Sequence, residues 1–199
     1  MSPILDSIGS VKAFGWGSLV IPNSFESIAT TTVGAGGAAD VTFSSIPSTF
    51  KHLQIRAIHR SEGSGTGVDW LDIRFNSDSG SNYAYHYLIG DGSSPFAGAN
   101  SSQSKILSAL GQPNDGQPAS VFGATVIDIL DYASTTKNKT VRTLNGLSNN
   151  QTSENFIGLS SGLWMNNTTA ISSISLFNNT SANDIAQYSH FALYGIKGA

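Results

Sequence analysis

The spacing of apolar residues constrains the fold of this chain more than any other feature. Apolar and polar residues alternate in short runs, and a helical period is almost absent. In WLDIRFN (70–76), Leu71, Ile73 and Phe75 fall on one side of an extended backbone, while Asp72 and Arg74 fall on the other. Polar, glycine-rich turns separate these runs at intervals typical of an all-β sandwich.

The alternating runs predict ten strands and two antiparallel sheets packed as a jelly-roll-like β-sandwich. The expected strands are 25–33, 40–46, 50–60, 70–76, 82–90, 120–132, 139–148, 155–165, 170–178 and 190–196. Two short segments, 102–110 and 180–188, are candidates for helices or loops. Long polar loops are expected at 61–69, 91–103 and 111–119, and loops at the ends of a sandwich commonly carry binding sites.

Composition and charge limit the partners of the chain. Its 199 residues suffice for one domain with a short extension, and it has no Cys, which excludes disulfides. A formal net charge of -3 gives no basic field for nucleic acid. No stretch approaches the ~18 apolar residues of a membrane span. Residues 1–24 lack the pattern of a secretory signal, so we expect folding in a cytoplasm.

The N-terminal part differs from the rest of the chain. Residues 1–22 are expected to form an extension that attaches to a partner, and residues 23–199 to form the sandwich domain. The attachment would use the apolar side chains of the extension, which are Leu5, Ile8, Val11, Phe14 and Trp16. An alternative is that this segment adds an edge strand to its own sheet.

Patterns that resemble catalytic motifs lack their structural context. The string GLSSG (158–162) matches a nucleophile elbow, but the residues after it predict more strand instead of the required helix. The segment GAGGAA (34–39) resembles a dinucleotide loop, but a flexible hairpin loop fits better because no helix follows. The four histidines form no close metal pair. We therefore expect no catalytic residue, no metal and no cofactor.

Aromatic residues are the remaining candidates for a binding site. Trp70 and the row of Tyr83, Tyr85 and Tyr87 are candidates for a solvent-accessible face that binds sugars. The alternative is that these aromatic side chains fill the sandwich or a subunit interface. Trp164 is flanked by Leu163 and Met165, which favours a place in the core.

The two ends of the chain resemble those of bacteriophage virion proteins. The last strand is similar to an S-x-F-x-L-Y-G-I ending, formed here by Ser189, Phe191, Leu193, Tyr194, Gly195 and Ile196. The opening LDSIGSVKAFGWG (5–17) is similar to short N-terminal tags of phage tail-associated proteins. The middle resembles phage receptor-binding and head-decoration domains, which are commonly trimeric jelly rolls.

This resemblance implies a non-enzymatic structural protein of the virion. The expected form is a trimeric tail-fibre or receptor-binding module that is attached to other virion proteins through its N-terminus and contacts a host surface glycan. The first alternative is a capsid cement or decoration protein. The second is a free-standing carbohydrate-binding lectin module. Neither nucleic acid nor a membrane is an expected partner.

Overall fold

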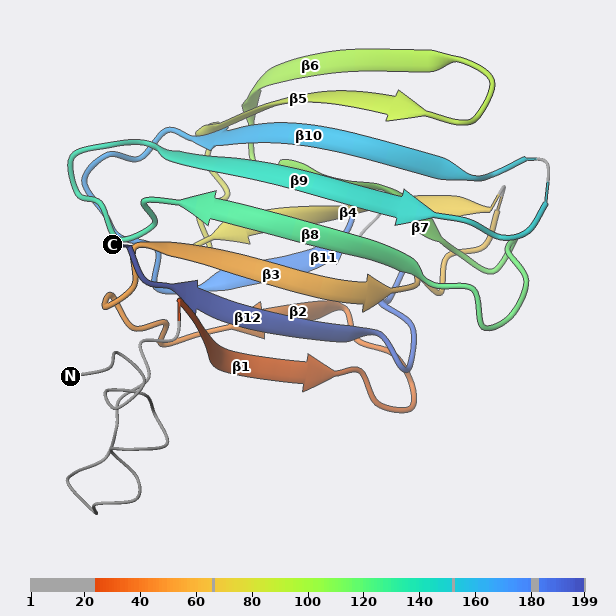
Figure 1. Ribbon diagram of the computed structural model, residues 1–199, viewed down its shortest axis with the longest axis horizontal. Helices are drawn as coiled ribbons and strands as arrows, with labels where there is room; N and C mark the ends of the chain where they lie inside the picture. Colours follow the sequence, from red (N-terminus) through yellow and green to blue (C-terminus); the bar gives the residue numbers. More distant parts are fainter. Residues whose placement is uncertain (1–23, 66, 152, 180–182, 199) are drawn as a thin grey trace, which may run out of the picture.

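A computed structural model describes residues 24–65, 67–151, 153–179 and 183–198. This part of the chain contains twelve β-strands and no helix (Figure 1). The strands are β1 (Phe25–Thr32), β2 (Asp40–Phe43), β3 (His52–His59), β4 (Val68–Phe75), β5 (Tyr83–Gly90), β6 (Pro95–Gln103), β7 (Ile106–Pro113), β8 (Gly123–Leu130), β9 (Lys139–Leu147), β10 (Phe156–Trp164), β11 (Ile174–Asn178) and β12 (His190–Ile196). Among the described residues, no helix is long and apolar enough to cross a membrane.

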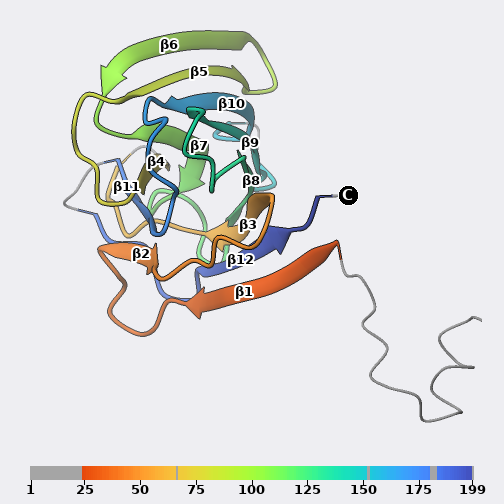
Figure 2. The same cartoon turned by 90° about the vertical axis from the view of Figure 1, so that its left-hand side faces the viewer.

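The strands form two antiparallel sheets. The larger sheet has eight strands in the order β1-β12-β3-β8-β9-β10-β5-β6, and the smaller has four in the order β2-β11-β4-β7. Figure 2 shows the two layers, with β5 and β6 extending beyond the smaller sheet. The expected all-β sandwich is confirmed, because the chain crosses repeatedly between two sheets that share one core.

The core lies between the inner faces of the two sheets. Leu71, Ile73 and Phe75 of β4 are fully buried, as their alternation predicts. Trp164 is also buried, and its ring stacks on Tyr83 with centroids 6.3 Å apart. The connection 34–39 is not a hairpin loop, because β1 belongs to the larger sheet and β2 to the smaller.

The helix considered at 102–110 is wrong, because β6 and β7 occupy this segment. The physical reason is that β7 is buried on both faces: Ile106 packs in the main core, and Leu107 packs in a second cluster with Ile89. A strand covered on both sides loses the alternation that identifies it. The expected loops 91–103 and 111–119 are likewise shortened by these two strands.

The other short segment considered as a helix or loop, 180–188, lies partly outside the described residues. Its described part, 183–188, contains no helix.

Candidate functional site

Large apolar side chains project from the outer face of the eight-stranded sheet. Five of them, on β3, β5, β9 and β10, are about half exposed: Ile58 55%, Leu88 49%, Leu144 51%, Ile157 62% and Leu159 51%. The solvated face of an antiparallel sheet is usually polar, and isolated apolar side chains on it need no explanation. These five side chains do require an explanation, because the strand register brings them together.

Direct pairing places the apolar residues side by side. Leu144 on β9 lies between Val126 on β8 and Leu159 on β10, and Leu159 also pairs with Leu88 on β5. In the neighbouring row, Ile58 pairs with Ala124. We call this surface the outer apolar patch, and its members are Ile58, Leu88, Ala124, Val126, Leu144, Ile157 and Leu159. Exposed apolar patches that are contiguous over several strands commonly mark interaction sites.

The sequence of β10 explains why the patch exists. Its small residues Gly158, Ser160 and Gly162 face the core, so the larger Ile157 and Leu159 face outward. A Cβ atom on Gly162 would lie 2.5 Å from Ile106 Cγ2 on β7. Because β7 packs so close to β10, only small side chains fit on the inner face at Ser160 and Gly162.

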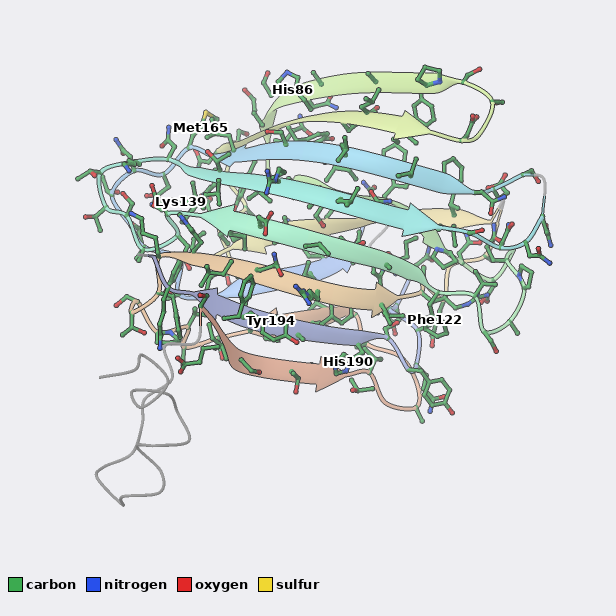
Figure 3. The ribbon with its side chains drawn as sticks, in the orientation of Figure 1. His86, Phe122, Lys139, Met165, His190 and Tyr194 are labelled. Atoms are coloured by element: carbon green, nitrogen blue, oxygen red, sulfur yellow. The ribbon has the colours of Figure 1, made fainter. Side chains whose placement is uncertain are left out.

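A shallow hollow of about 770 Å³ opens within the outer face, beside the centre of the patch. Ile58, Val126, Leu144 and Ile157 line it, and Gly146 contributes no side chain to fill it. His190 and Tyr194 of β12 lie at its edge, where Figure 3 labels them. The hollow is therefore an apolar surface with room for a large side chain.

A single arginine forms one wall of the hollow. The guanidinium carbon of Arg56 lies 5.9 Å from the ring centroid of Phe25 and 5.8 Å from that of Tyr194. These cation–π contacts hold the side chain against two rings. They also connect the first described strand, β1, to the hollow.

A polar row borders the patch on the side away from the hollow. Arg142 Nη2 donates a 2.8 Å hydrogen bond to Asp128 Oδ2, and Gln54 Nε2 donates another to Asp128 Oδ1 at 2.8 Å. Partial burial raises the pKa of Asp128, but these two hydrogen bonds outweigh it and hold the pKa below its ordinary value. The outer face thus has an apolar half and a charged half.

The structure brings together three of the four aromatic residues predicted as a site. Trp70 and Tyr87 meet edge to face at 6.3 Å, and Tyr85 lies 6.5 Å from Tyr87. All three pack, partly buried, on Ile89 and Leu107. Tyr83 is separate, because it is fully buried beside Trp164.

The tyrosine row does not form the expected solvent-exposed face, and this prediction is corrected. The three tyrosines face the space between the sheets, and the alternate residues His86 and Leu88 are the exposed ones. Tyr85 and Tyr87 are partly exposed, whereas Tyr83 is fully buried. Tyr83 is therefore not accessible to a ligand. A role for Trp70, Tyr85 and Tyr87 in ligand binding stays a prediction.

A buried acid lies near this aromatic cluster. Asp72 is 1% exposed, and its Oδ2 lies 2.5 Å from Lys105 Nζ. Burial raises the pKa of Asp72 to about 6, although Lys105 acts in the opposite direction. The alternation within β4 alone predicts that Asp72 is exposed. The one signal in the sequence against its exposure is the apolar run of β7, the strand that pairs with β4.

The catalytic-looking strings occupy ordinary strand and core positions. GLSSG lies within β10, and Ser160 Oγ donates a hydrogen bond to the carbonyl of Leu107. His59 is buried, and its Nε2 lies 2.7 Å from Thr125 Oγ1. Among the described residues, no three acidic or histidine side chains are grouped so as to hold a metal.

One arginine shapes the loop that follows β7. Two nitrogens of the Arg60 guanidinium donate to the carbonyl oxygens of Asn114, Gln117, Pro118 and Val121. All its acceptors are backbone groups, so Arg60 fixes the loop in place. The predicted binding role of loop 111–119 stays a prediction.

The predicted attachment residues Leu5, Ile8, Val11, Phe14 and Trp16 lie outside the described residues. Comparison with known proteins finds no matching family model and no matching curated protein.

Proposed function

We propose that this chain is a non-enzymatic structural protein of a virion, of the bacteriophage type, that works as a homo-oligomeric surface module. In this proposal the N-terminal extension attaches the module to other virion proteins. The domain assembles as a trimer and presents its loops to a host surface glycan, as tail-fibre and receptor-binding proteins do.

The outer apolar patch is the observation that supports assembly. Leu144, Ile157 and Leu159 leave half or more of their surface in water in the single chain. Burying such side chains contributes roughly 25 cal/mol per Å² of apolar area, so contact with another protein surface is favourable. The adjoining charged row at Asp128 and Arg142 would form the polar rim typical of an interface.

Two measurements test this function. The first is the mass of the purified chain in solution by light scattering, and a value three times the 20.8 kDa of the monomer supports the trimer. The second is the copy number in purified particles by quantitative mass spectrometry. A few tens of copies or fewer support the tail, and hundreds of copies support the cement alternative. A monomer that is absent from particles contradicts the proposal and favours the lectin alternative.

A further inference from the structure

A second hollow opens at one end of the sandwich, where the loops that follow β3 and β7 meet the loop that precedes β12. We call it the loop-end hollow. It measures about 600 Å³, and the lining residues that matter here are Arg60, Glu62, Asp115, Phe122, Gln187 and Tyr188. Figure 3 labels Phe122 at this end of the molecule, beside the start of β8. We propose that the loop-end hollow binds one uncharged hexose unit of a glycan. This inference depends on the proposed function in one respect, the contact with a host surface glycan, and it names the site and the class of sugar.

Tyr188 presents an aromatic ring to solvent at this hollow. It is 70% exposed, more than any other large hydrophobic residue in the described part of the chain. Its φ of 72° lies in the left-handed region, which is costly for a bulky residue. The backbone is fixed there because the amide of Tyr188 donates to the carbonyl of Val33 at 3.0 Å, and the amide of Val33 donates to the carbonyl of Ser189 at 2.8 Å. Strain that is retained where the ring gains little burial points to a functional role for the ring.

Two carboxylates supply hydrogen-bond acceptors beside this ring. Glu62 and Asp115 are both exposed to solvent. The Oδ1 atom of Asp115 lies 4.0 Å from Arg60 Nη2, which is too far for a hydrogen bond. Sugar hydroxyls can therefore donate to this carboxylate, and hydrogen bonds to a charged acceptor are roughly twice as strong as neutral ones. The amide of Gln187 can both donate and accept.

Arg60 sets the charge of the ligand. Its Nη1 and Nη2 donate four hydrogen bonds to backbone carbonyl oxygens of residues 114–121, and these match the four N–H groups that the two nitrogens carry. The guanidinium therefore cannot hold a carboxylate or phosphate through two parallel hydrogen bonds. One guanidinium and two carboxylates give the lining a formal charge of -1, which repels an anion. The positive charge 4.0 Å from Asp115 also disfavours a cation, so the lining favours an uncharged ligand.

The loops around the hollow are fixed by hydrogen bonds within the domain. Ile185 pairs with Ala38 and with Ser61 in isolated β-bridges. The amide of Glu62 donates to the carbonyl of Asp184 at 2.8 Å. A preorganised site loses little conformational entropy when a ligand binds.

An uncharged hexose matches this combination of groups. The C–H groups of its ring are apolar and pack on the face of an aromatic side chain such as Tyr188, while the half-buried Phe122 adds apolar surface. Its hydroxyls donate to Glu62 and Asp115 and accept from the amide of Gln187. The size of the hollow lies within the usual range for sites that bind small molecules.

Saturation-transfer NMR with the full-length chain tests this inference. The probes are D-glucose, D-galactose, D-mannose and N-acetyl-D-glucosamine at millimolar concentration. N-acetylneuraminic acid and lysine amide are the acidic and the cationic comparisons. We expect a signal from at least one of the neutral sugars that is stronger than the signal from either charged probe. No signal from the neutral sugars, or a stronger signal from a charged probe, would overturn the inference.

Two pairs of variants place the binding in the hollow. Tyr188→Gly should raise the dissociation constant of the neutral sugar about tenfold or more. It should unfold at the same or a higher temperature, because glycine adopts a positive φ without strain. Its control, Phe96→Ala, removes an exposed ring from β6 outside the hollow and should leave binding unchanged. Glu62→Gln should raise the constant about tenfold, whereas Glu26→Gln makes the same change on the exposed part of β1 and should have no effect. Unchanged binding in either hollow variant, or an equal loss in its control, would contradict the inference.

The solution mass and the copy number separate the failure of this inference from the failure of the proposed function. A trimer that is present in particles but binds no neutral sugar in the loop-end hollow overturns this inference alone. A monomer that is absent from particles contradicts the proposed virion protein, even where the hollow binds the sugar.

Discussion

Leu144 on β9 and Leu159 on β10 are direct cross-strand partners on the outer face of the larger sheet, and each leaves 51% of its surface exposed. They lie side by side on adjacent strands, and about half of each side chain is left uncovered by the part of the chain that the structure describes. Their contribution to folding is therefore small, while their burial against another protein surface would favour association. A substitution at either position should separate these two properties.

Replacement of Leu159 by Asp should dissociate the oligomer without unfolding the domain. The new carboxylate stays solvated in the monomer but loses its water in an interface, so the dissociation constant should rise about tenfold or more. Ser161→Asp is the control, because Ser161 is exposed two residues further along the same strand and face. Sedimentation velocity measures both variants, and an unchanged mass for Leu159→Asp would contradict assembly through this patch.

The buried Asp72 should make the domain more stable in mild acid. Burial raises its pKa from 3.8 to about 6 in the folded state, so between these values the folded state binds more protons than the unfolded state. The Asp72 contribution to the free energy of unfolding therefore falls by at most about 3 kcal/mol as the pH rises from 4 to 6, and is constant above. Urea unfolding of Asp72→Asn should lack this slope and should show no loss of stability at pH 7. A marked loss at pH 7 would mean that the pair with Lys105 is net stabilising.

His59 should have the opposite effect in the same range. Burial lowers its pKa from 6.5 to about 4, because the uncharged ring is enclosed against Phe191. Below pH 6.5 the unfolded state takes up a proton that the folded state does not, so stability falls by about 3 kcal/mol as the pH drops to 4. His59→Gln cannot titrate and should lose this part of the slope. The comparison uses the slope, since the loss of ring packing lowers the stability of the variant at every pH.

A buried lysine should stabilise the turn after β10. The Nζ of Lys139, which Figure 3 labels at the start of β9, donates to the carbonyl oxygens of Asn166 and Thr169. Lys139→Met leaves both acceptors without this donor and should lower the free energy of unfolding by about 1–3 kcal/mol. The control Lys137→Met removes only an exposed pair with Asp131 and should cost under about 1 kcal/mol. Equal losses in urea titrations would show that Lys139 has no special role.

Alternation in the sequence is sufficient to predict strands that are buried on one face. It places Leu71, Ile73 and Phe75 in the core. It fails for β7, where both faces are buried and Ile106 and Leu107 are apolar neighbours. The face of β7 that carries Leu107 is covered by residues of β5 such as Ile89. The sequence of β7 itself does not indicate that β5 covers this face.

The candidate site was missed for a related reason. In β10 the apolar residues alternate with Gly and Ser, and the ordinary interpretation places Ile157 and Leu159 in the core. The actual orientation depends on how close β7 lies to the inner face, which is a tertiary property. Glycine and serine at every second position of an otherwise apolar strand were the available signal that another strand passes close by.

This explanation of β10 predicts that enlarging its inner face is costly. Gly162→Ala would place a methyl group 2.5 Å from Ile106 Cγ2, so β7 and β10 would have to separate. Overpacking of this kind should lower the free energy of unfolding by about 1–3 kcal/mol. Ser161→Ala, on the outward side of the same strand, should change it by less than about 0.5 kcal/mol. Thermal and urea unfolding of both variants measure these changes in the free energy of unfolding. A neutral Gly162→Ala would mean that close packing of β7 does not set the orientation of β10, and that the outward position of Ile157 and Leu159 has another cause.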